Sequence, residues 1–355
     1  MKKTRHRIKN AVRAVRSWVI PYARSRFRQD EFRPILSYLF TDWKCNIDCH
    51  YCFDFDNKRE GMDLDTAKAS IDWLKSKGCR VVAIMGGEPL LRKKFILEVI
   101  RYGSNRGMFV YLPTNGYLLD KEFIEKAGEA GLAAWNVAVD TIRPKPGLPK
   151  AYSVIEKQLR YLIEMQKKYN YLIFFNINIT NKNMEDVREL TRIARKNDIG
   201  TDYHICEKPP KEVKLEHFNH RGNDLYITEK DWEKADELLD WLIRKNEQGY
   251  TMVNSKSHLK AMKRFMRGEK VKWKCLAGIN GSFIRPDGSI APCFTLQEKG
   301  DWGNVFEGEK FDRDRLAEMK KECQDHCLST CFFNLGRYCM SLKDSLRWAM
   351  KHKKS

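Results

Sequence analysis

Six apolar, strand-like segments alternate with helix-like segments between residues 30 and 210. One helix-like segment, DLDTAKASIDWLKSKG (63–78), has an acidic start and a glycine stop. Strands that are joined through helices run parallel to one another. The alternation therefore predicts an α/β fold, a partial (β/α)6 barrel of the TIM type. The strand-like segments are RPILSYLFTDW (33–43), CRVVAIMGGEP (79–89), MFVYLPTNG (108–116), LAAWNVAVD (132–140), YLIFFNINIT (171–180) and GTDYHIC (200–206).

Polar and metal-binding residue types follow these strands where each one ends. In barrels of this type the chemistry collects at the C-terminal ends of the strands. We therefore expect one catalytic rim, made by residues from separate parts of the chain. Its candidate members are Cys45, Cys49 and Cys52 after the first strand, Gly86, Gly87, Glu88 and Pro89 after the second, and Asn115, Asp140 and Asn178 at the ends of the next three.

The chain has eleven cysteines and no secretory signal, which favours reduced, metal-binding or catalytic thiols over disulfides. The spacing Cys-x3-Cys-x2-Cys of residues 45–52 supplies three thiolates, one short of a closed zinc or iron–sulfur site. His50 offers a fourth ligand for zinc, although it directly follows Cys49. The other interpretation is a [4Fe–4S] cluster with one iron left open for a substrate or cofactor.

The two motifs together resemble the radical S-adenosylmethionine (SAM) superfamily, whose signature is Cys-x3-Cys-x-aromatic-Cys; Tyr51 fills the aromatic position. The resemblance implies a [4Fe–4S] cluster on the three cysteines, and SAM with its amino group at Gly86–Pro89, attracted by Glu88. Asn115, Asp140 and Asn178 would hold the ribose or face the substrate. Reductive cleavage of SAM would yield a 5′-deoxyadenosyl radical, with flavodoxin or ferredoxin as the electron-donating partner.

A second cysteine group follows residue 274, and SFIRPDGSIAPC (282–293) within it predicts a hairpin with a Pro-Asp-Gly turn. The group resembles the SPASM/twitch extensions that hold auxiliary [4Fe–4S] clusters. Its later part departs from the usual SPASM spacing and reads Cys-x3-Cys-x3-Cys-x7-Cys. We expect one auxiliary cluster on Cys275, Cys293, Cys327 and Cys331, and a zinc ribbon is the alternative. The candidate metal ligands of the group are Cys275, Cys293, Cys323, Cys327, Cys331 and Cys339.

The formal charge of +19 is concentrated at the two ends of the chain. Residues 1–28 carry ten Lys and Arg and no acid, with Val12, Val15 and Val19 at helical spacing. Such basic amphipathic ends dock on the protein body, rest on an anionic membrane or bind nucleic acid; of these, nucleic acid is not expected. The expected organisation is a basic helix (1–29), the barrel (30–210), a helical bridge (211–274), the cluster extension (275–339) and a second basic helix (340–355).

These features predict a cytoplasmic enzyme with peripheral attachment to the inner face of the membrane. The favoured substrate is a lipid or another membrane-proximal molecule. Peptide or protein modification is the rival enzymatic interpretation, and a non-catalytic iron–sulfur scaffold is the third. A scaffold needs no site for methionine, so the intact GGEP motif argues against it.

Overall fold

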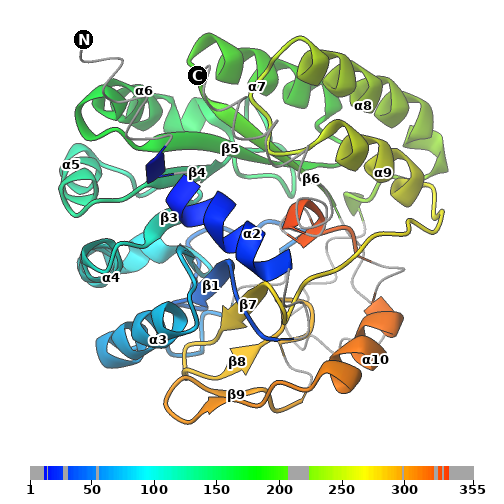
Figure 1. Cartoon of the computed structure of the whole chain (residues 1–355). Helices are drawn as coiled ribbons and strands as arrows, with labels where there is room; N and C mark the ends of the chain where they lie inside the picture. Colours follow the sequence, from blue (N-terminus) through cyan, green and yellow to red (C-terminus); the bar gives the residue numbers. More distant parts are fainter. Residues whose placement is uncertain are drawn as a thin grey trace.

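An eight-stranded sheet with the strand order β6-β5-β4-β3-β2-β1-β7-β8 forms the centre of the computed structural model (Figure 1). The structure describes residues 12–13, 15–26, 31–52, 56–206, 224–297, 300–323, 327–329 and 332–335. The first six strands run parallel, as the sequence predicts. They are β1 (Leu36–Phe40), β2 (Val81–Met85), β3 (Phe109–Thr114), β4 (Ala134–Ala138), β5 (Leu172–Ile179) and β6 (Gly200–Ile205).

Five helices connect these strands: α3 (Leu64–Ser76), α4 (Lys93–Asn105), α5 (Lys121–Glu129), α6 (Tyr152–Tyr169) and α7 (Met184–Lys196). A short 3-10 turn, η2 (Pro89–Arg92), precedes α4. Local chemistry sets the limits of α3: the Asp63 carboxylate accepts the Thr66 N–H, and Gly78 ends the helix with φ +81°. The predicted (β/α)6 succession is therefore confirmed.

Side chains of β5 alternate between two environments. Those facing the helices are buried in the main apolar core together with residues of α6 and α7. Those facing the barrel interior are partly exposed: Leu172, Phe174, Asn176 and Asn178. Inward residues of β3 and β4, among them Tyr111 and Asn136, are partly exposed as well. A closed TIM barrel fills its interior with side chains, so this partial barrel is open inside.

The predicted hairpin consists of β7 (Gly281–Ile284) and β8 (Ile290–Ala291) and joins the barrel sheet. Strand β7 runs parallel to β1, with Leu36 opposite Gly281 and Leu39 opposite Ile284. The cysteine-rich extension thus continues the sheet at the edge of β1. Beyond it lie β9 (Gly303–Asn304), β10 (Gly308–Glu309) and α10 (Arg313–Cys323).

The predicted bridge covers the opposite edge of the sheet with α8 (Trp232–Glu247) and α9 (Lys256–Met266); a 3-10 turn, η4 (Glu229–Asp231), leads into α8. Asn254 attaches it to β6, because its side chain accepts the Tyr203 N–H at 2.7 Å and donates to the Tyr203 carbonyl at 2.8 Å. Ser255 then caps α9 by accepting the His258 N–H. Figure 1 shows α8 beside α7 and α9 beside α8.

A π-helical turn, η1 (Val15–Val19), and α2 (Ile20–Arg26) form the described N-terminal helix. Trp18 stacks on Tyr22 and meets Phe109 edge to face, with ring centroids 6.4 and 6.2 Å apart. The rings of Trp18 and Tyr22 pack on a cluster formed by the first residues of the strands, including Leu36 and Val81. We call this apolar cluster the barrel floor. Docking of this helix on the body is therefore observed, and the predicted helix over 340–355 lies outside the described residues.

No helix within the described ranges combines the length and the apolar character needed to cross a membrane.

Replacing Trp18 with Ala should lower the free energy of unfolding by about 2 kcal/mol, roughly half the cost of removing a fully buried tryptophan. Half of the loss is expected because Trp18 is only partly buried on the barrel floor. Val12→Ala is the matched control, since Val12 is 55% exposed and should change stability by less than about 0.5 kcal/mol. Urea unfolding followed by far-ultraviolet circular dichroism measures both. Equal effects of the two substitutions would contradict the docked arrangement.

Candidate active site and auxiliary cysteine site

The chain leaves β1 and enters the loop that carries Cys45, Cys49 and Cys52. Two backbone hydrogen bonds shape this loop: the Cys52 N–H donates to the Cys49 carbonyl at 3.0 Å, and the Cys45 N–H donates to Oδ1 of Asn57 at 3.0 Å. Cys49 is buried, and the other two are half-buried. All three are free thiols, so the loop presents three potential thiolate ligands at the C-terminal end of β1.

Gly86 and Gly87 lie directly against the backbone of this cysteine loop. The Gly87 N–H donates to the Asp42 carbonyl, and the Glu88 N–H donates to the Lys44 carbonyl, each at 2.8 Å. A Cβ atom on Gly86 would stand 2.6 Å from the Asp42 carbonyl oxygen, and one on Gly87 would overlap the Lys44 carbonyl. The glycines are therefore required for the close approach of two backbones.

The Glu88 carboxylate connects the second strand to the third. It is 1% exposed and accepts three hydrogen bonds, from the Thr114 hydroxyl and the Asn115 N–H at 2.8 Å and from the Leu90 N–H at 2.9 Å. Burial raises the pKa of Glu88, while these donors oppose that rise. A carboxylate has about four lone-pair sites, so one remains for the ammonium group that the sequence assigns to it.

Asn115 ties the end of β3 to the cysteine loop. Its Nδ2 donates to Oδ1 of Asn46 at 2.8 Å, and its Oδ1 accepts the Tyr117 N–H at 3.0 Å. Pro89 begins η2 directly behind Glu88 and is buried there. The ends of β1, β2 and β3 are thus connected through side chains that the sequence placed on one rim.

Tyr51, between two of the cysteines, makes the corresponding connection to β4 and β5. Its hydroxyl donates to Oδ2 of Asp140 at 2.5 Å, and Oδ1 of Asp140 accepts the Asn178 N–H at 2.8 Å. The Lys150 Nζ lies 5.2 Å from the centroid of the Tyr51 ring. The structure thus brings Tyr51, Asp140 and Asn178 together, as expected, and adds a lysine that sequence reasoning missed.

Burial raises the pKa of the Cys49 thiol to about 12 and also raises that of Cys45, and in both cases the charge of Lys150 acts in the opposite direction. Burial by itself lowers the pKa of Lys150, but the thiols and Asp140 outweigh it and raise that pKa. Only thiolates bind metal, so Lys150 supplies charge that favours the ligand form. A single lysine in a loop carries no sequence pattern by which it could have been found.

His50 points away from the three thiols and serves the loop structurally. Its Nδ1 lies 3.2 Å from Oδ1 of Asp224, and its N–H donates to the Gly147 carbonyl at 3.0 Å. Among the described residues, no three His, Cys, Asp or Glu side chains are close enough to bind one metal ion. A cluster binds each cysteine at a different iron, so its ligands stand farther apart than those of one zinc ion. Three free thiols on one loop are the donor set that a cluster with one open iron needs.

Residues 44–202 match the family model described as the Radical SAM superfamily. The AdoMet-dependent heme synthase of Methanosarcina barkeri is 24% identical over 306 residues, which cover 79% of this chain and 82% of the relative. Among solved structures, anSMEcpe with bound AdoMet and the Cp18Cys peptide has a TM-score of 0.58 at 20% identity, covering 90% of this chain and 98% of that one. SuiB of Streptococcus suis, bound to the precursor peptide SuiA, has a TM-score of 0.61 at 15% identity. The match covers 81% of this chain and 66% of SuiB.

A partial barrel with three cysteines after its first strand defines an iron–sulfur enzyme that uses S-adenosylmethionine. The chain contains a radical SAM domain over residues 44–202, and its cysteine-rich segment after residue 274 resembles a SPASM/twitch extension. Its cofactors are therefore SAM and a [4Fe–4S] cluster. The assignment of Cys45, Cys49 and Cys52 to that cluster stays a prediction, which the donor set of the loop supports.

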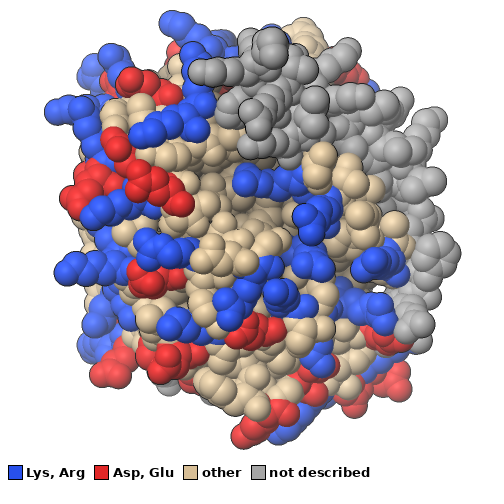
Figure 2. Space-filling model, turned by 60° about the vertical axis from the view of Figure 1, so that its left-hand side comes forward, with Lys and Arg blue, Asp and Glu red and all other residues tan. Residues whose placement is uncertain are grey.

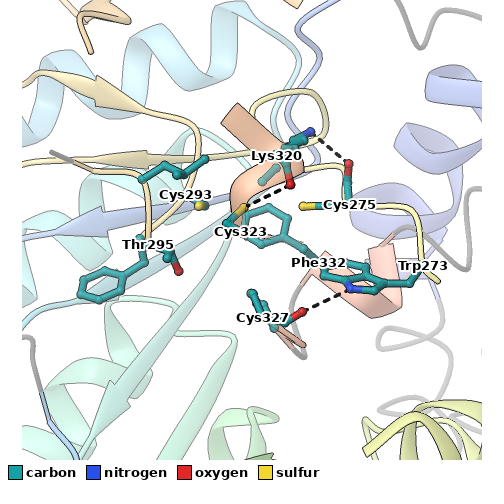
Figure 3. Close-up of a pocket in the computed structure, with 12 residues that line it drawn as sticks. Trp273, Cys275, Cys293, Thr295, Lys320, Cys323, Cys327 and Phe332 are labelled. Atoms are coloured by element: carbon teal, nitrogen blue, oxygen red, sulfur yellow. Dashed lines mark hydrogen bonds between the residues drawn. The ribbon is translucent and has the colours of Figure 1, made fainter. Parts of the chain in front are cut away.

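A second group of thiols surrounds a pocket in the extension (Figure 3). Cys275 precedes β7, and β8 runs back so that Cys293 returns to the same end of the hairpin. Cys323 at the end of α10 and Cys327 complete the described thiols of this pocket. Two predicted ligands, Cys331 and Cys339, lie outside the described residues. The structure thus brings the four described candidates to one pocket, including Cys323, which was not among the four favoured ligands.

Lys320 also lines this pocket, one helical turn before Cys323. Its Nζ donates to the Cys275 carbonyl at 3.0 Å, and the Trp273 indole donates to the Cys327 carbonyl at 3.2 Å. Burial raises the pKa of Cys293 to about 12, and the neighbouring Cys275 adds to that rise. Lys320 places a positive charge among thiols that must ionise to bind metal. Its spacing of three residues from Cys323 was the available sequence signal.

Replacing Cys45, Cys49 and Cys52 with Ala should abolish the formation of 5′-deoxyadenosine from SAM in dithionite-reduced protein, because the ligands of the SAM-binding cluster are lost. Iron content should fall by about four atoms per chain. Cys79→Ala, a buried cysteine that contacts Ile35 and Val81 at the starts of the strands, is the matched control and should retain the product. Persistent cleavage in the triple variant, or a zinc-only metal content in wild type, would contradict the assignment.

The auxiliary site should keep about four irons and an iron–sulfur absorbance after the first three cysteines are removed. Adding Cys275→Ala and Cys293→Ala should eliminate both signals. Cys323→Ala and Cys331→Ala are then made singly in the variant that lacks only Cys45, Cys49 and Cys52. Loss of iron in either one identifies a further ligand of the auxiliary site. Eight irons would mean two auxiliary clusters, and zinc alone would make the extension a structural ribbon.

Proposed function

We propose that this radical SAM enzyme activates a C–H bond of a lipid or another membrane-proximal substrate that enters the open barrel. The observation that carries this proposal is an N-terminal helical segment that docks on the barrel and also exposes apolar side chains. Its inner face, with Trp18 and Tyr22, packs on the barrel floor. Outside this contact, Val12, Val15 and Ile20 are exposed by 55%, 43% and 40%.

Basic side chains accompany this exposed apolar surface. Arg16 and Arg24 are exposed on the same helix, and residues 1–28 contain no acid. An apolar stripe flanked by arginines suits the interface of an anionic membrane, where each basic residue contributes about 1 kcal/mol. Figure 2 shows Lys and Arg side chains around a hollow near the centre of one face. Most Asp and Glu side chains in this view lie toward the edges of the face.

The barrel interior offers an apolar surface that continues from this helix. Phe109 and Phe174 face inward near the floor and belong to the cluster that contacts Trp18. The opposite end of the interior reaches the rim where Asn178 and Asp140 connect to the cysteine loop. An alkyl chain on the aromatic side would therefore place a more polar part of the molecule near the rim.

When bound, a reduced cluster supplies the electron that cleaves SAM and releases the radical that takes hydrogen from substrate. The chain's own residues hold and shield that site. Glu88 and Cys49 are 1% and 2% exposed, and the glycine loop covers the cysteine-loop backbone. Exclusion of water protects a radical from side reactions. Enzymes of this superfamily generally need a reductant such as flavodoxin or ferredoxin, and the proposed location is the cytoplasmic face of the membrane.

The rival proposal is peptide or protein modification. It requires neither the exposed Val12 and Val15 nor the basic helix for substrate access. Measurements of membrane affinity and of the substrate dependence of SAM cleavage therefore distinguish the lipid proposal from the peptide proposal.

Full-length protein should float with phosphatidylglycerol vesicles and remain at the bottom with phosphatidylcholine vesicles. Binding should weaken in 1 M salt, where the Debye length is about 3 Å. Arg16→Gln with Arg24→Gln should reduce partitioning about 30-fold, as the loss of about 2 kcal/mol predicts. These substitutions retain Trp18 and Tyr22, whereas deletion of residues 1–28 would strip the barrel floor. Lys157→Gln with Lys167→Gln, both exposed on α6, removes the same charge as a control.

The same protein should form 5′-deoxyadenosine faster with a membrane lipid extract than without it, under anaerobic reduction with SAM. Stimulation by peptides and none by lipids would favour the rival. Absence of flotation with both kinds of vesicle would remove the main support for a lipid substrate without affecting the radical SAM assignment.

A further inference from the structure

Neighbouring strands β4, β5 and β6 carry a group of polar side chains on the inward face of the barrel. In the strand register Asn176 lies beside Asp202, and Asn178 lies beside His204. Asn136 of β4 is paired with Phe174 of β5, one inward position before Asn176. We call these five side chains the amide patch: Asn136, Asn176, Asn178, Asp202 and His204. Outward side chains of the same strands are apolar and buried.

Three oxygen atoms of the amide patch are buried without a hydrogen-bond partner among the described residues. They are Oδ1 of Asn136, of Asn178 and of Asp202. Asp202 is only 7% exposed, and its other carboxylate oxygen lies 3.5 Å from Nε2 of His204. A buried acceptor is nearly always satisfied in a native protein. Three such oxygens lie on the inward face of neighbouring strands, and donors from a molecule bound in the interior would satisfy them.

The amide patch lies next to the site of radical formation. The Asn178 N–H donates to Asp140 at 2.8 Å, and Asp140 accepts the hydroxyl of Tyr51 at 2.5 Å. Tyr51 stands between Cys49 and Cys52 in the cysteine loop. A molecule held by the patch therefore sits at the end of the interior where chemistry is expected.

We propose that the amide patch binds a polyol head group of the substrate through its hydroxyl donors. An ionised Asp202 only accepts hydrogen bonds, so it pairs with hydroxyl groups and repels a carboxylate or phosphate head. The aromatic floor, with Phe109 and Phe174, lies below the patch and contacts the apolar part. This inference rests on the proposed lipid function for the alkyl part, whereas the recognition of hydroxyl groups stands on the patch itself.

Equilibrium dialysis of the anaerobic holoenzyme with SAM tests the proposal, using monomeric octyl β-glucoside, octanoate and free glucose as probes. Octyl glucoside should bind at least tenfold more tightly than octanoate. Asp202→Leu and Asn136→Leu should each weaken glucoside binding at least tenfold and leave octanoate unchanged. Ile177→Val, an outward position on β5, is the matched control and should change neither.

Asp202→Asn keeps the side-chain volume and decides the outcome if the leucine variants lose iron or structure. It should weaken glucoside binding about threefold, because one acceptor oxygen is replaced by a donor. Unchanged glucoside binding in this variant would overturn the proposal, as would tighter octanoate binding in wild type or equal losses for both alkyl probes. If glucose binds through Asp202 and the octyl chain adds nothing, the amide patch stands and the lipid proposal fails.

Discussion

The pairing of β1 with strands on both of its sides holds the two cysteine groups in one framework. Strand β1 hydrogen-bonds to β2 along one edge and to β7 along the other, both in parallel. Its C-terminal end leads into the loop of Cys45, Cys49 and Cys52, whereas Cys275 and Cys293 lie at the opposite end, beside the start of β7. Five residues of strand rise about 16 Å. The sheet therefore places the two groups toward opposite ends of β1.

The catalytic rim depends on a further contact, between the glycine loop and the cysteine loop. No side chain fits where Gly86 and Gly87 meet the carbonyls of Asp42 and Lys44. Glu88 continues this connection to β3, and Tyr51 with Asp140 continues it to β5. The ends of β2 to β5 are thus connected to the cysteine loop by hydrogen bonds, either directly or through Glu88 and Asp140. Such second-layer contacts hold metal ligands in position, and several use residues whose sequence motif suggested cofactor binding alone.

Local patterns in the sequence were sufficient for the succession of strands and helices and for most of the rim. Alternation of apolar segments predicted β1 to β6, and the Pro-Asp-Gly turn predicted the β7–β8 hairpin, because turns and strands leave short-range signals. The pairing of β7 with β1 joins residues more than 240 positions apart, and nothing local encodes it. Lys150 was missed for the same reason, because its role comes from thiols that are distant in the sequence. Trp18 belongs to a helix whose periodicity fits docking and membrane binding equally.

The open interior makes physical sense only together with its two ends. Inward side chains of β5 are partly exposed along the whole strand, whereas their outward neighbours are fully packed. A chain that required only stability would fill this space, as closed barrels do, and would give both Asp202 carboxylate oxygens partners, whereas one of them has none among the described residues. At the floor, Trp18 and Tyr22 cover the apolar strand starts with a helix that also exposes Val15 and Ile20. At the rim, Tyr51 and Asp140 tie the strand ends to the cysteine loop. The interior therefore lies between an amphipathic helix at the floor and the radical-forming loop at the rim. Apolar side chains line it near the floor, and hydrogen-bond acceptors line it near the rim. That polarity is suited to a molecule with an apolar tail and a hydroxyl-bearing head, with the head toward the cysteine loop.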